Sequence, residues 1–469
     1  MLLRVSSEGL NMVFHKIERV HFVGIGGIGM SGIAEVLLNL GFKITGSDVR
    51  KTDITERLEG LGASIFYGHK EENIVDSDVV VISSAIRPEN PEVKKAKELF
   101  IPVIQRAEML AELMRMKYSV AVAGAHGKTT TTSLISTILA HAGLDPTCVI
   151  GGKLNSFGSN AKLGDSKYLV AEADESDGTF LLLYPTIAVV TNIDMEHLDF
   201  YKDLNEIKGA FTAFLNKVPF YGLDIICIDN ANLQSLIPLL KRRYMTYGFS
   251  KQADLRAENI VYEGFITKFR VIYKGYELGE IALTLPGAHN VVNTLAACGV
   301  CIELDIPFPT IKEALKNFSG IHRRLEVKWD KDIKLIDDYG HHPTEIKATL
   351  SAIRKMSKGR IIVAFQPHRY SRTKALMDEF VTSFNEADVL VVTEIYAASE
   401  DRIEGITGSS LADRIRSSGH KNVFFAPTKE EAAEKILEIA RKGDVVVTLG
   451  AGDIYKIDER LKRAWSGKE

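Results

Sequence analysis

Apolar runs of strand length alternate with amphipathic runs of helical length along almost the whole chain, and this order limits the possible folds more than any other feature. The first strand-like run leads through a glycine-rich loop to a helical run at residues 30–40, and the same order begins again at residue 118 and after residue 320. Strands are predicted at residues 19–23, 43–46, 79–83, 118–123, 168–172, 187–191, 333–337, 360–365, 389–393 and 445–449. Strands joined through helices pair in parallel, so we expect an α/β fold with largely parallel sheets.

The length of the chain sets the expected number of domains. At about 150 residues per domain, the 469 residues correspond to about three domains. The first nucleotide-type block ends near residue 106, and the alternation then continues to about residue 318. A break follows at residues 319–324 (SGIHRR). We therefore expect domains over residues 1–106, 107–319 and 320–469.

Composition and charge argue against several classes of protein. The formal net charge is −3 without a long run of either sign, which does not suit a nucleic-acid-binding surface. The sequence contains no apolar stretch of about 18 residues, so we expect no membrane span. Residues 1–12 lack a signal core, and either Met1 or Met12 fits the start.

The four cysteines give no sign of a disulfide framework. Cys298 and Cys301 form a CxxC pair, but it lies inside an apolar, helical run. A redox or zinc pair would need exposed thiolates and further ligands, so we predict buried core thiols. This use of cysteine fits a reducing, cytoplasmic location.

Residues 118–132 carry the strongest functional signal. A strand-like run leads into GAHGKT at residues 124–129 and then into a threonine-rich helical run. In such a turn the backbone N–H groups and the helix N-terminus attract phosphate, Lys128 reaches the terminal phosphates, and the Thr129 hydroxyl binds Mg²⁺. The loop is shorter than the general Walker pattern, because Val122 stands where that pattern has glycine. The alternative, a tight turn without a ligand, gives Lys128 no packing role.

Acidic residues follow the next strand-like run. Four of them fall within six residues: Glu172, Asp174, Glu175 and Asp177. One or two carboxylates at a strand end suit Mg²⁺, whereas the alternative is a solvated acidic loop. Another acidic segment at residues 194–199 contains His197, which fits either a second Mg²⁺ or a structural hydrogen bond.

The first glycine loop, GIGGIG at residues 24–29, matches the G-x-G-x-x-G pattern between a strand and a helix, with Asp48 about 20 residues further on. By itself the pattern suggests NAD. The physical requirement is only a pyrophosphate on a helix N-terminus, and a UDP-linked sugar also carries one. Ser83 and Ser84, at a neighbouring strand end, and His69 can add contacts. A glycine turn that serves packing alone is the alternative.

Two further segments lie near the boundary of the third block. Residues 286–293 (PGAHNVVN) open a helix, and Asn290 offers a donor and an acceptor that suit an adenine edge, or else it caps the helix. Arg323 and Arg324 fit either the γ-phosphate of a nucleotide or a solvated linker.

Two loops of the third block follow consecutive strands and are expected at the same edge of its sheet. They are residues 337–343 (DDYGHHP) and 366–372 (QPHRYSR). Arg369 and Arg372 suit carboxylates. The pair His341 and His342 could also suggest a transition metal, but no further ligand follows at a clear spacing.

Taken together, these motifs resemble the Mur ligases, which build the peptide stem of peptidoglycan. The resemblance covers essentially the whole chain after the first dozen residues. The shortened phosphate loop is typical of this family, although Ala125 replaces its more usual Thr. Residues 287–293 look like its adenine-side motif, and residues 338–343 look like its third-domain signature. Residues 24–29 and 368–372 are similar to the family member that adds L-alanine to UDP-N-acetylmuramate.

The resemblance implies three α/β domains: a Rossmann-like UDP-sugar domain over residues 1–106, a central P-loop ATPase-type domain over residues 107–319, and a Rossmann-like C-terminal domain over residues 320–469 that closes over ATP and binds the amino acid. The implied reaction joins L-alanine to the lactyl carboxylate through an acyl phosphate, with ATP and Mg²⁺ and without nucleic acid or membrane. The nearest alternative is a sibling ligase that attaches a preformed tripeptide. A nicotinamide dehydrogenase and a nucleotide-gated binding protein are more distant alternatives.

The motifs and the resemblance together assign residues to each ligand. For ATP they imply Gly124, His126, Gly127, Lys128, Thr129, Thr130, Asn290, Arg324 and Asp338. For the UDP-sugar they imply Gly26, Gly27, Gly29, Asp48, His69, Ser83, Ser84 and Arg106. For Mg²⁺ they imply Thr129, Glu172 and His197, and for the amino acid and substrate carboxylates Tyr339, His342, Arg369 and Arg372. The expected catalytic residues are Lys128, Glu172, His197 and His341, and either histidine fits the base that deprotonates the amine.

Overall fold

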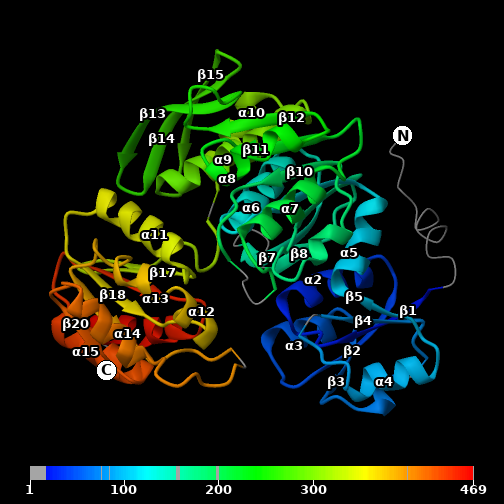
Figure 1. The fold of residues 1–469 in the computed structure, drawn as a ribbon, viewed down its shortest axis with the longest axis horizontal. Coiled ribbons are helices and arrows are strands. Elements are labelled where there is room, and N and C mark those ends of the chain that lie inside the picture. Colours follow the sequence, from blue (N-terminus) through cyan, green and yellow to red (C-terminus); the bar gives the residue numbers. More distant parts are fainter. Residues whose placement is uncertain are drawn as a thin grey trace. The chain divides into compact units, whose positions relative to one another are not determined.

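The computed structural model describes residues 17–74, 76–83, 85–154, 159–196, 200–318, 320–398 and 400–467 (Figure 1). The expectations for Met1, Met12, Ser84 and His197 concern residues outside these ranges. The chain divides into two compact units. The first unit consists of Met1–Glu258, Arg270–Ile281 and Val292–Ser319, and the second of Asn259–Phe269, Ala282–Val291 and Gly320–Glu469.

A five-stranded parallel sheet opens the first unit, in the order β3-β2-β1-β4-β5. Its strands are β1 (Arg19–Val23), β2 (Lys43–Asp48), β3 (Ser64–Tyr67), β4 (Val79–Ile82) and β5 (Val103–Gln105). Its helices are α2 (Ile28–Asn39), α3 (Asp53–Gly60), α4 (Pro91–Glu98) and α5 (Arg106–Arg115). Because β1 lies between β2 and β4, the strand order reverses at β1, and its carboxyl end is a favoured place for a ligand.

A ten-stranded sheet follows, in the order β15-β14-β13-β12-β11-β10-β6-β9-β7-β8. Its strands are β6 (Tyr118–Ala123), β7 (Thr147–Leu154), β8 (Ser159–Lys162), β9 (Tyr168–Glu172), β10 (Ile187–Val190), β11 (Leu223–Cys227), β12 (Tyr244–Gly248), β13 (Leu255–Glu263), β14 (Ile266–Tyr273) and β15 (Tyr276–Leu283). The helices around it are α6 (Lys128–His141), α7 (Leu204–Leu215), α8 (Ala231–Gln234), α9 (Ala288–Glu303) and α10 (Phe308–Lys316). The order reverses again at β6, which pairs in parallel with both β10 and β9.

The strands β13, β14 and β15 depart from the predicted alternation of strands and helices. Only two residues separate β13 from β14 and two separate β14 from β15, so these strands form an antiparallel meander without intervening helices. Positive φ angles at Gly264 (58°), Lys274 (48°) and Gly275 (89°) allow the tight turns. The central sheet is therefore parallel in its middle and extended at one edge by hairpins.

The second unit contains a six-stranded sheet in the order β16-β17-β21-β18-β19-β20. Its strands are β16 (Glu326–Asp330), β17 (Lys334–Asp338), β18 (Ile361–Phe365), β19 (Val389–Val392), β20 (Val423–Phe425) and β21 (Val445–Leu449). Its helices are α11 (Pro343–Met356), α12 (Tyr370–Ala375), α13 (Met377–Val381), α14 (Gly408–Ser417), α15 (Lys429–Ile439) and α16 (Ile457–Trp465). All its pairs are parallel except β16 with β17.

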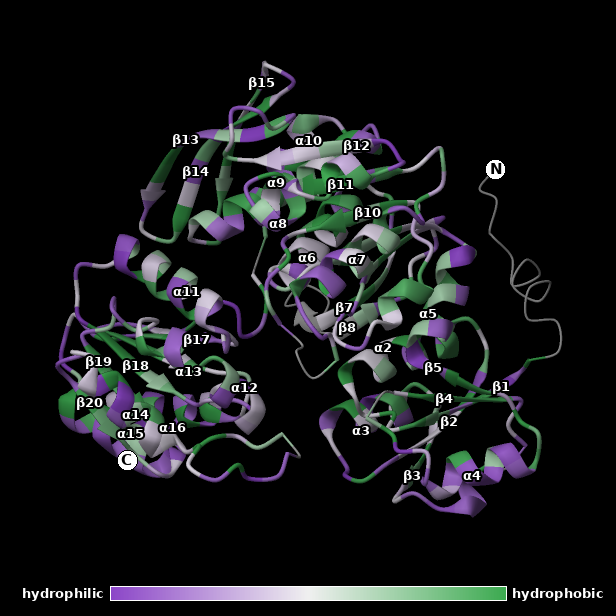
Figure 2. Cartoon of the chain, in the orientation of Figure 1, coloured by the Kyte–Doolittle hydropathy of each residue, from purple (hydrophilic) through white to green (hydrophobic). Residues whose placement is uncertain are grey.

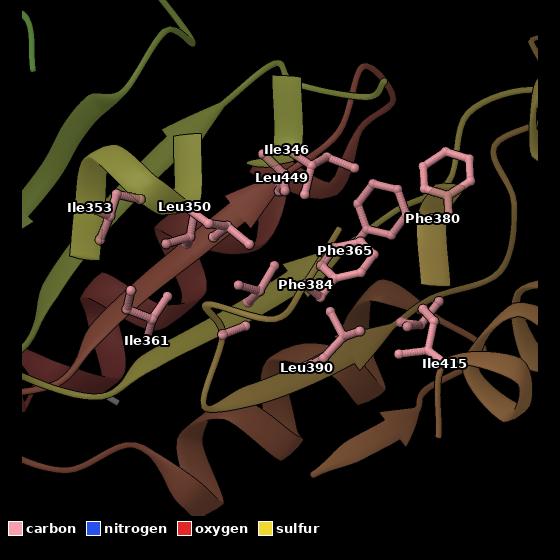
Figure 3. Packing of buried hydrophobic residues seen from close by; sticks show 14 of the residues in the cluster. Ile346, Leu350, Ile353, Ile361, Phe365, Phe380, Phe384, Leu390, Ile415 and Leu449 are labelled. Carbon is pink, nitrogen blue, oxygen red and sulfur yellow. The ribbon is translucent and has the colours of Figure 1, made fainter. Parts of the chain in front are cut away.

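Both faces of this sheet are buried. Alternate residues of a strand face opposite sides, and Ile361 and Phe365 of β18 pack with Ile346 and Leu350 of α11 on one side (Figure 3). Ile362 of β18 joins the core of α15 and α16 on the other side. Hydropathy colouring agrees, since the central strands are green and the covering helices carry purple stretches (Figure 2). Burial on both faces explains why these strands read as continuous apolar runs.

The three sheets with their helices confirm the predicted α/β architecture, and each predicted strand lies within two residues of its observed bounds. The domain boundaries at residues 106 and 319 stay predictions. All four cysteines are buried and free, as predicted. Among the helices of the described residues, none combines the length and the apolar character that a membrane span requires.

Candidate functional site

The turn between β6 and α6 has the geometry of a phosphate-binding loop. Gly124 (φ +127°) and Gly127 (φ +83°) have left-handed backbone conformations. A Cβ at Gly124 would lie 2.2 Å from Oγ1 of Thr191, and a Cβ at Gly127 would lie 2.5 Å from Oδ1 of Asn293. Only glycine fits these positions. Gly127 is also the N-cap of α6, and it has no side chain that would compete with a phosphate for the first N–H groups of the helix.

The end of the neighbouring strand β10 holds this loop in place. The hydroxyl of Thr191 and Nδ2 of Asn192 both donate to the carbonyl oxygen of His126, at 2.6 and 2.9 Å. In return the N–H of His126 donates to Oδ1 of Asn192 (2.9 Å), and Nε2 of His126 lies 3.3 Å from Oδ2 of Asp194. These bonds fix the loop against the end of β10.

Lys128, the first residue of α6, is held beside the loop. Its Nζ donates to the carbonyl oxygen of Gly124 and to Oε1 of Glu175, both at 2.6 Å. The Glu175 side chain is 4% exposed. Burial opposes the charge on Lys128, but the Glu175 carboxylate outweighs burial and raises the pKa of Lys128 above its usual range. Lys128 is therefore a charged donor with a buried counter-ion at the point where loop phosphates would bind.

Hard oxygen atoms lie next to Lys128. The hydroxyl of Thr129 donates to Oε2 of Glu172 (3.2 Å), and the N–H of Gly151 donates to Oε1 of Glu172 (2.7 Å). A hydroxyl and a carboxylate beside a phosphate loop are ligands that Mg²⁺ prefers. The structure thus brings together two of the three residues predicted for Mg²⁺, and the third, His197, lies outside the described residues.

The other predicted acids have specific partners. Oδ2 of Asp174 accepts from Nη2 of Arg106 (3.3 Å). Asp177 accepts from the N–H and the hydroxyl of Thr179, at 3.1 and 2.6 Å. With Glu175 bound to Lys128, the cluster is an ordered set of contacts and not a freely solvated acidic loop.

The first glycine loop lies at the carboxyl end of β1. The N–H groups of Gly24 and Ile25 donate to the carbonyl oxygen of Ser47 (2.8 and 3.0 Å), and the N–H of Gly26 donates to Oδ2 of Asp48 (2.9 Å). Gly27 is the N-cap of α2, and the first turn of that helix contains no acidic residue. The loop therefore presents the positive end of α2 to an anionic ligand.

The other residues predicted for the UDP-sugar follow the strands beside this loop. Arg106 follows β5, and a Cβ at Gly29 would lie 3.1 Å from its Nη1. His69 follows β3, and its Nδ1 lies 2.9 Å from Oγ of Ser47. Ser83 follows β4 directly, whereas Ser84 lies outside the described residues. The parallel sheet thus gathers these side chains at one edge.

In the second unit, Asp338 ends β17 and is 4% exposed. Its Oδ2 accepts from the N–H of Leu325 (2.8 Å). Its Oδ1 accepts from the N–H of Gly340 (2.9 Å) and the hydroxyl of Thr349 (3.1 Å). In this structure Asp338 shapes the loop that follows β17, and its role toward a ribose stays a prediction.

The two arginines before β16 differ. Arg323 is 9% exposed, and its guanidinium binds Oδ2 of Asp337 (3.1 Å) and the carbonyl oxygens of Gly450 (2.5 Å) and Gly452 (3.1 Å). The alternative of a solvated linker is therefore wrong for Arg323, which ties two loops of the sheet together. Arg324, with a more exposed side chain, remains the candidate for a phosphate contact.

Imidazole and phenol rings gather in the second unit. The rings of His341 and His368 are 5.9 Å apart, Tyr396 stacks on His368 at 5.6 Å, and Tyr339 meets His341 edge-on at 5.6 Å. Burial lowers the pKa of His341 to about 3 and the pKa of His368 to about 4. Both rings are therefore neutral near pH 7, and their burial makes them weak proton acceptors.

The residues predicted for carboxylates lie on neighbouring loops of this unit. Nη1 of Arg372 is 3.2 Å from Nδ1 of His368. Arg369 has φ +70°, a conformation that L-residues rarely adopt. His342 is the N-cap of α11, where its Nδ1 accepts from the N–H of Thr344 (3.3 Å). The binding roles of these residues and of Tyr339 stay predictions.

The asparagines of the 286–293 segment lie in the first turns of α9. Nδ2 of Asn290 donates to the carbonyl oxygen of Pro286 (2.8 Å), which closes the turn before the helix. Asn293 instead approaches the phosphate loop at Gly127. The adenine contact of Asn290 stays a prediction.

Sequence reasoning missed the roles of three residues in these groups. Glu175 was one acid among four, and only the fold places it on Lys128. Tyr396 follows β19 and stacks on His368, and Glu92 binds the predicted ligand-contacting residue His69. A polar residue after a strand end was an available signal for Glu175 and Tyr396, but not for Glu92, which lies in α4.

Three family models match nearly the whole chain. The model described as "Mur ligase family, catalytic domain" matches residues 19–118. "Mur ligase middle domain" matches residues 122–301, and "Mur ligase, glutamate ligase domain" matches residues 323–452.

Proteins of similar sequence and structure agree with these matches. The UDP-N-acetylmuramate–L-alanine ligase of Geotalea uraniireducens is 60% identical over 97% of this chain and 100% of its own length. The ligase of the same name from Geobacter sulfurreducens is 56% identical over 95% of this chain and 97% of its own. The crystal structure of the UDP-N-acetylmuramate–alanine ligase of Thermotoga maritima has a TM-score of 0.82 and 30% identity, covering 96% of this chain and 100% of that chain. A murein peptide ligase from Psychrobacter arcticus has a TM-score of 0.69 and 25% identity, covering 95% and 98%.

Proposed function

The chain belongs to the Mur ligase family, and from this premise we propose that it joins L-alanine to the lactyl carboxylate of UDP-N-acetylmuramate with conversion of ATP to ADP and phosphate. One observation supports the choice of substrates. Relatives named UDP-N-acetylmuramate–L-alanine ligase are 56–60% identical to this chain over almost their full length. The product is a precursor of peptidoglycan.

The phosphate loop supports the role of ATP. The N–H groups at the start of α6 and the ammonium of Lys128 converge where β- and γ-phosphates would lie. Phosphoryl transfer spreads negative charge over the equatorial oxygens, so fixed positive groups lower the barrier mainly by electrostatics and positioning. Lys128 would leave Glu175 in part and turn toward the γ-phosphate.

Thr129 and Glu172 fit a magnesium ion, because they supply a hydroxyl and a carboxylate oxygen 3.2 Å apart beside the loop. Mg²⁺, when bound, would neutralise phosphate charge. Glu172 is oriented for this by the N–H of Gly151.

The lactyl carboxylate oxygen would attack the γ-phosphorus, and the bond from that phosphorus to the β,γ-bridging oxygen would break to release ADP. The amine of L-alanine would then attack the acyl carbon, a proton would leave the nitrogen, and phosphate would depart as the amide forms. His341 is one candidate for the base, but a pKa of about 3 makes it a weak proton acceptor near pH 7. His197 is the other.

The test is mass spectrometry of the products formed from UDP-N-acetylmuramate, ATP, Mg²⁺ and a pool of amino acids and the stem tripeptide. We expect UDP-N-acetylmuramoyl-L-alanine with one ADP and one phosphate per amide. Release of AMP and pyrophosphate would contradict the acyl-phosphate route. Selective use of the tripeptide would favour the sibling activity, which murein peptide ligases of 25–28% identity represent among the structural relatives.

A further inference from the structure

A buried carboxylate lies beside the first glycine loop, and the proposed reaction leaves it without a role. Glu92, in the first turn of α4, is fully buried. Its Oε2 accepts from the hydroxyl of Ser47 (2.6 Å) and lies 3.1 Å from Nδ1 of His69. Its Oε1 accepts from Nδ2 of Asn73 (2.5 Å), and Nε2 of His21 is 3.9 Å away. Four segments of the domain therefore converge on one carboxylate.

The surroundings keep this carboxylate ionised. Burial works against the charge, but His21 and the hydrogen bonds from Ser47 and Asn73 outweigh it and lower the pKa of Glu92 to about 2. The N-terminal end of α4 also favours a negative charge. An ionised carboxylate inside a domain carries a large desolvation cost, and apolar side chains of the same size often stabilise a fold better. A role beyond packing is therefore worth seeking.

The same hydrogen bonds reach the glycine loop. Ser47 uses its hydroxyl for Glu92 and its carbonyl oxygen for the N–H groups of Gly24 and Ile25. The adjacent Asp48 accepts from Gly26 through its side chain, and its carbonyl oxygen accepts from the N–H of Gly68 at 2.8 Å. The loop that would hold the pyrophosphate and the segment that carries His69 are thus attached to the same two residues.

His69 is the partner of Glu92 that reaches the ligand edge. Its side chain is 20% exposed, whereas Ser47, Asn73 and His21 are buried. Both contacts that His69 makes within the described part of the chain use Nδ1. A proton on Nδ1 donated to Glu92 leaves Nε2 as the ring nitrogen for a ligand.

We propose that Glu92 is a positioning residue of the UDP-sugar site, which binds Nδ1–H of His69 and so fixes the ring and the tautomer that present Nε2 to the UDP portion of the substrate. The inference rests on the proposed function, because it requires that the first glycine loop binds a UDP-sugar. It assigns to Glu92 an effect on substrate affinity that acts through His69 and leaves the ATP site unaffected.

The test combines Glu92→Gln, His69→Ala and the double variant in the full-length chain. Glu92→Gln is expected to raise the Kd for UDP-N-acetylmuramate about tenfold, by analogy with the carboxylate partners that orient metal-binding histidines. The Kd for ATP and kcat should change less than about twofold. In the His69→Ala background, Glu92→Gln should hardly raise the Kd for UDP-N-acetylmuramate any further, because its effect requires the imidazole ring that this background lacks.

Asp78→Asn is the matched control. Oδ2 of Asp78 accepts from the N–H groups of Glu18 and Arg19, both at 2.8 Å, at the amino edge of the same sheet. This variant removes a carboxylate from the domain and is expected to leave the Kd for the UDP-sugar unchanged. Nitrogen-15 spectra of labelled histidine give a second readout: His69 should carry its proton on Nδ1 in the native chain and lose this preference in Glu92→Gln.

The outcomes separate the two proposals. Absence of UDP-N-acetylmuramate binding by the native chain would overturn the proposed function itself. Native binding with an unchanged Kd in Glu92→Gln, or with additive effects in the double variant, would overturn the role of Glu92 alone. Equal losses of UDP-N-acetylmuramate affinity in Glu92→Gln and Asp78→Asn would also overturn the role of Glu92, because they would indicate general destabilisation of the domain.

Discussion

Lys128 and Glu175 form a buried ion pair beside the second glycine loop, so the lysine proposed to bind phosphate is also part of the folded core. Nζ of Lys128 and Oε1 of Glu175 are 2.6 Å apart, and only 4% of the Glu175 side chain is exposed. Such a pair couples chemistry to stability, because removing one partner leaves the other charge buried and alone.

We expect Lys128→Ala to lower kcat by roughly 10² or more, because a charge-stabilising donor is lost. The same change should lower the free energy of unfolding by about 3 kcal/mol, because Glu175 is left uncompensated. Adding Glu175→Gln should restore most of the stability and none of the turnover. Steady-state kinetics and urea unfolding measure the two effects, and normal turnover by Lys128→Ala would show that the loop is structural.

Glu172 should differ from Glu175 in its dependence on magnesium. Because Glu172 lies beside the Thr129 hydroxyl, Glu172→Ala should raise the Mg²⁺ concentration for half-maximal activity about tenfold or more. Glu175→Ala should leave that concentration unchanged. Titration of activity with Mg²⁺ distinguishes them, and equal, mild effects of both changes would contradict a specific metal role for Glu172.

At this scale the sequence predicted Lys128, Thr129 and Glu172 as a group, because a phosphate loop and a strand end have recognisable patterns. The ion pair with Glu175 was not predictable, since Lys128 begins α6 and Glu175 lies 47 residues further on, in the loop after β9. The burial of Arg323 was also missed, because its acceptors include carbonyl oxygens more than 120 residues away (Arg323 to Gly450), and a carbonyl leaves no mark in a sequence.

Among the elements, buried parallel strands were predictable and the meander was not. A strand buried on both faces is a continuous apolar run, as in β18 and β21. In β14 buried and exposed residues alternate irregularly, so the sequence pattern of a strand is weaker there. The meander was therefore read as part of the general alternation of strands and helices. The Lys274-Gly275 turn was the available signal for a hairpin.

Strand β11 contains a buried acid that should make stability depend on pH. Asp224 is fully buried, and neither carboxylate oxygen has a hydrogen-bond partner in the described part of the chain. Burial raises the pKa of Asp224 to about 8, against about 3.9 in an unfolded chain. Between these values the folded state keeps a proton that the unfolded state releases, so this group lowers stability as pH rises toward 8 and adds no further change above it.

Asp224→Asn should therefore be more stable than the native chain by on the order of 2–3 kcal/mol at pH 8, with little difference near pH 4. Urea unfolding at several pH values measures this. As a control, Asp254→Asn should destabilise near pH 8, because Asp254 accepts two hydrogen bonds from Thr246. A difference between Asp224→Asn and the native chain that does not grow with pH would contradict the argument.

For the whole molecule, two glycine loops in separate sheets predict two ligands with phosphate groups. The first loop resembles an NAD fingerprint, but the second loop is the one proposed to bind ATP, so a UDP-sugar is the expected ligand of the first. At 100 times its Kd, UDP-N-acetylmuramate should stabilise the chain by about 2.7 kcal/mol, and NAD at equal concentration should do little. Saturable stabilisation by NAD without any by the UDP-sugar would revive a dehydrogenase function.

Gly26→Val should abolish the stabilisation of the folded chain by UDP-N-acetylmuramate and leave its stabilisation by ATP intact. A Cβ at Gly26 would lie 2.8 Å from Oδ2 of Asp48, so the side chain would displace the loop. Gly60→Val is the control in the same domain, because nothing lies within 4 Å of a Cβ there. Loss of the UDP-sugar effect in both variants would indicate damage to the domain in general.

The burial of all four thiols makes this chain convenient for site-specific labelling. Burial raises the pKa of Cys148 and Cys227 to about 11 and that of Cys298 to about 12, so reactive thiolate is scarce near pH 7. Maleimide dyes should therefore react with a cysteine introduced on the surface and spare the native ones. Fluorescent donors and acceptors on the two compact units would then report ligand-dependent changes in distance without prior removal of any native cysteine.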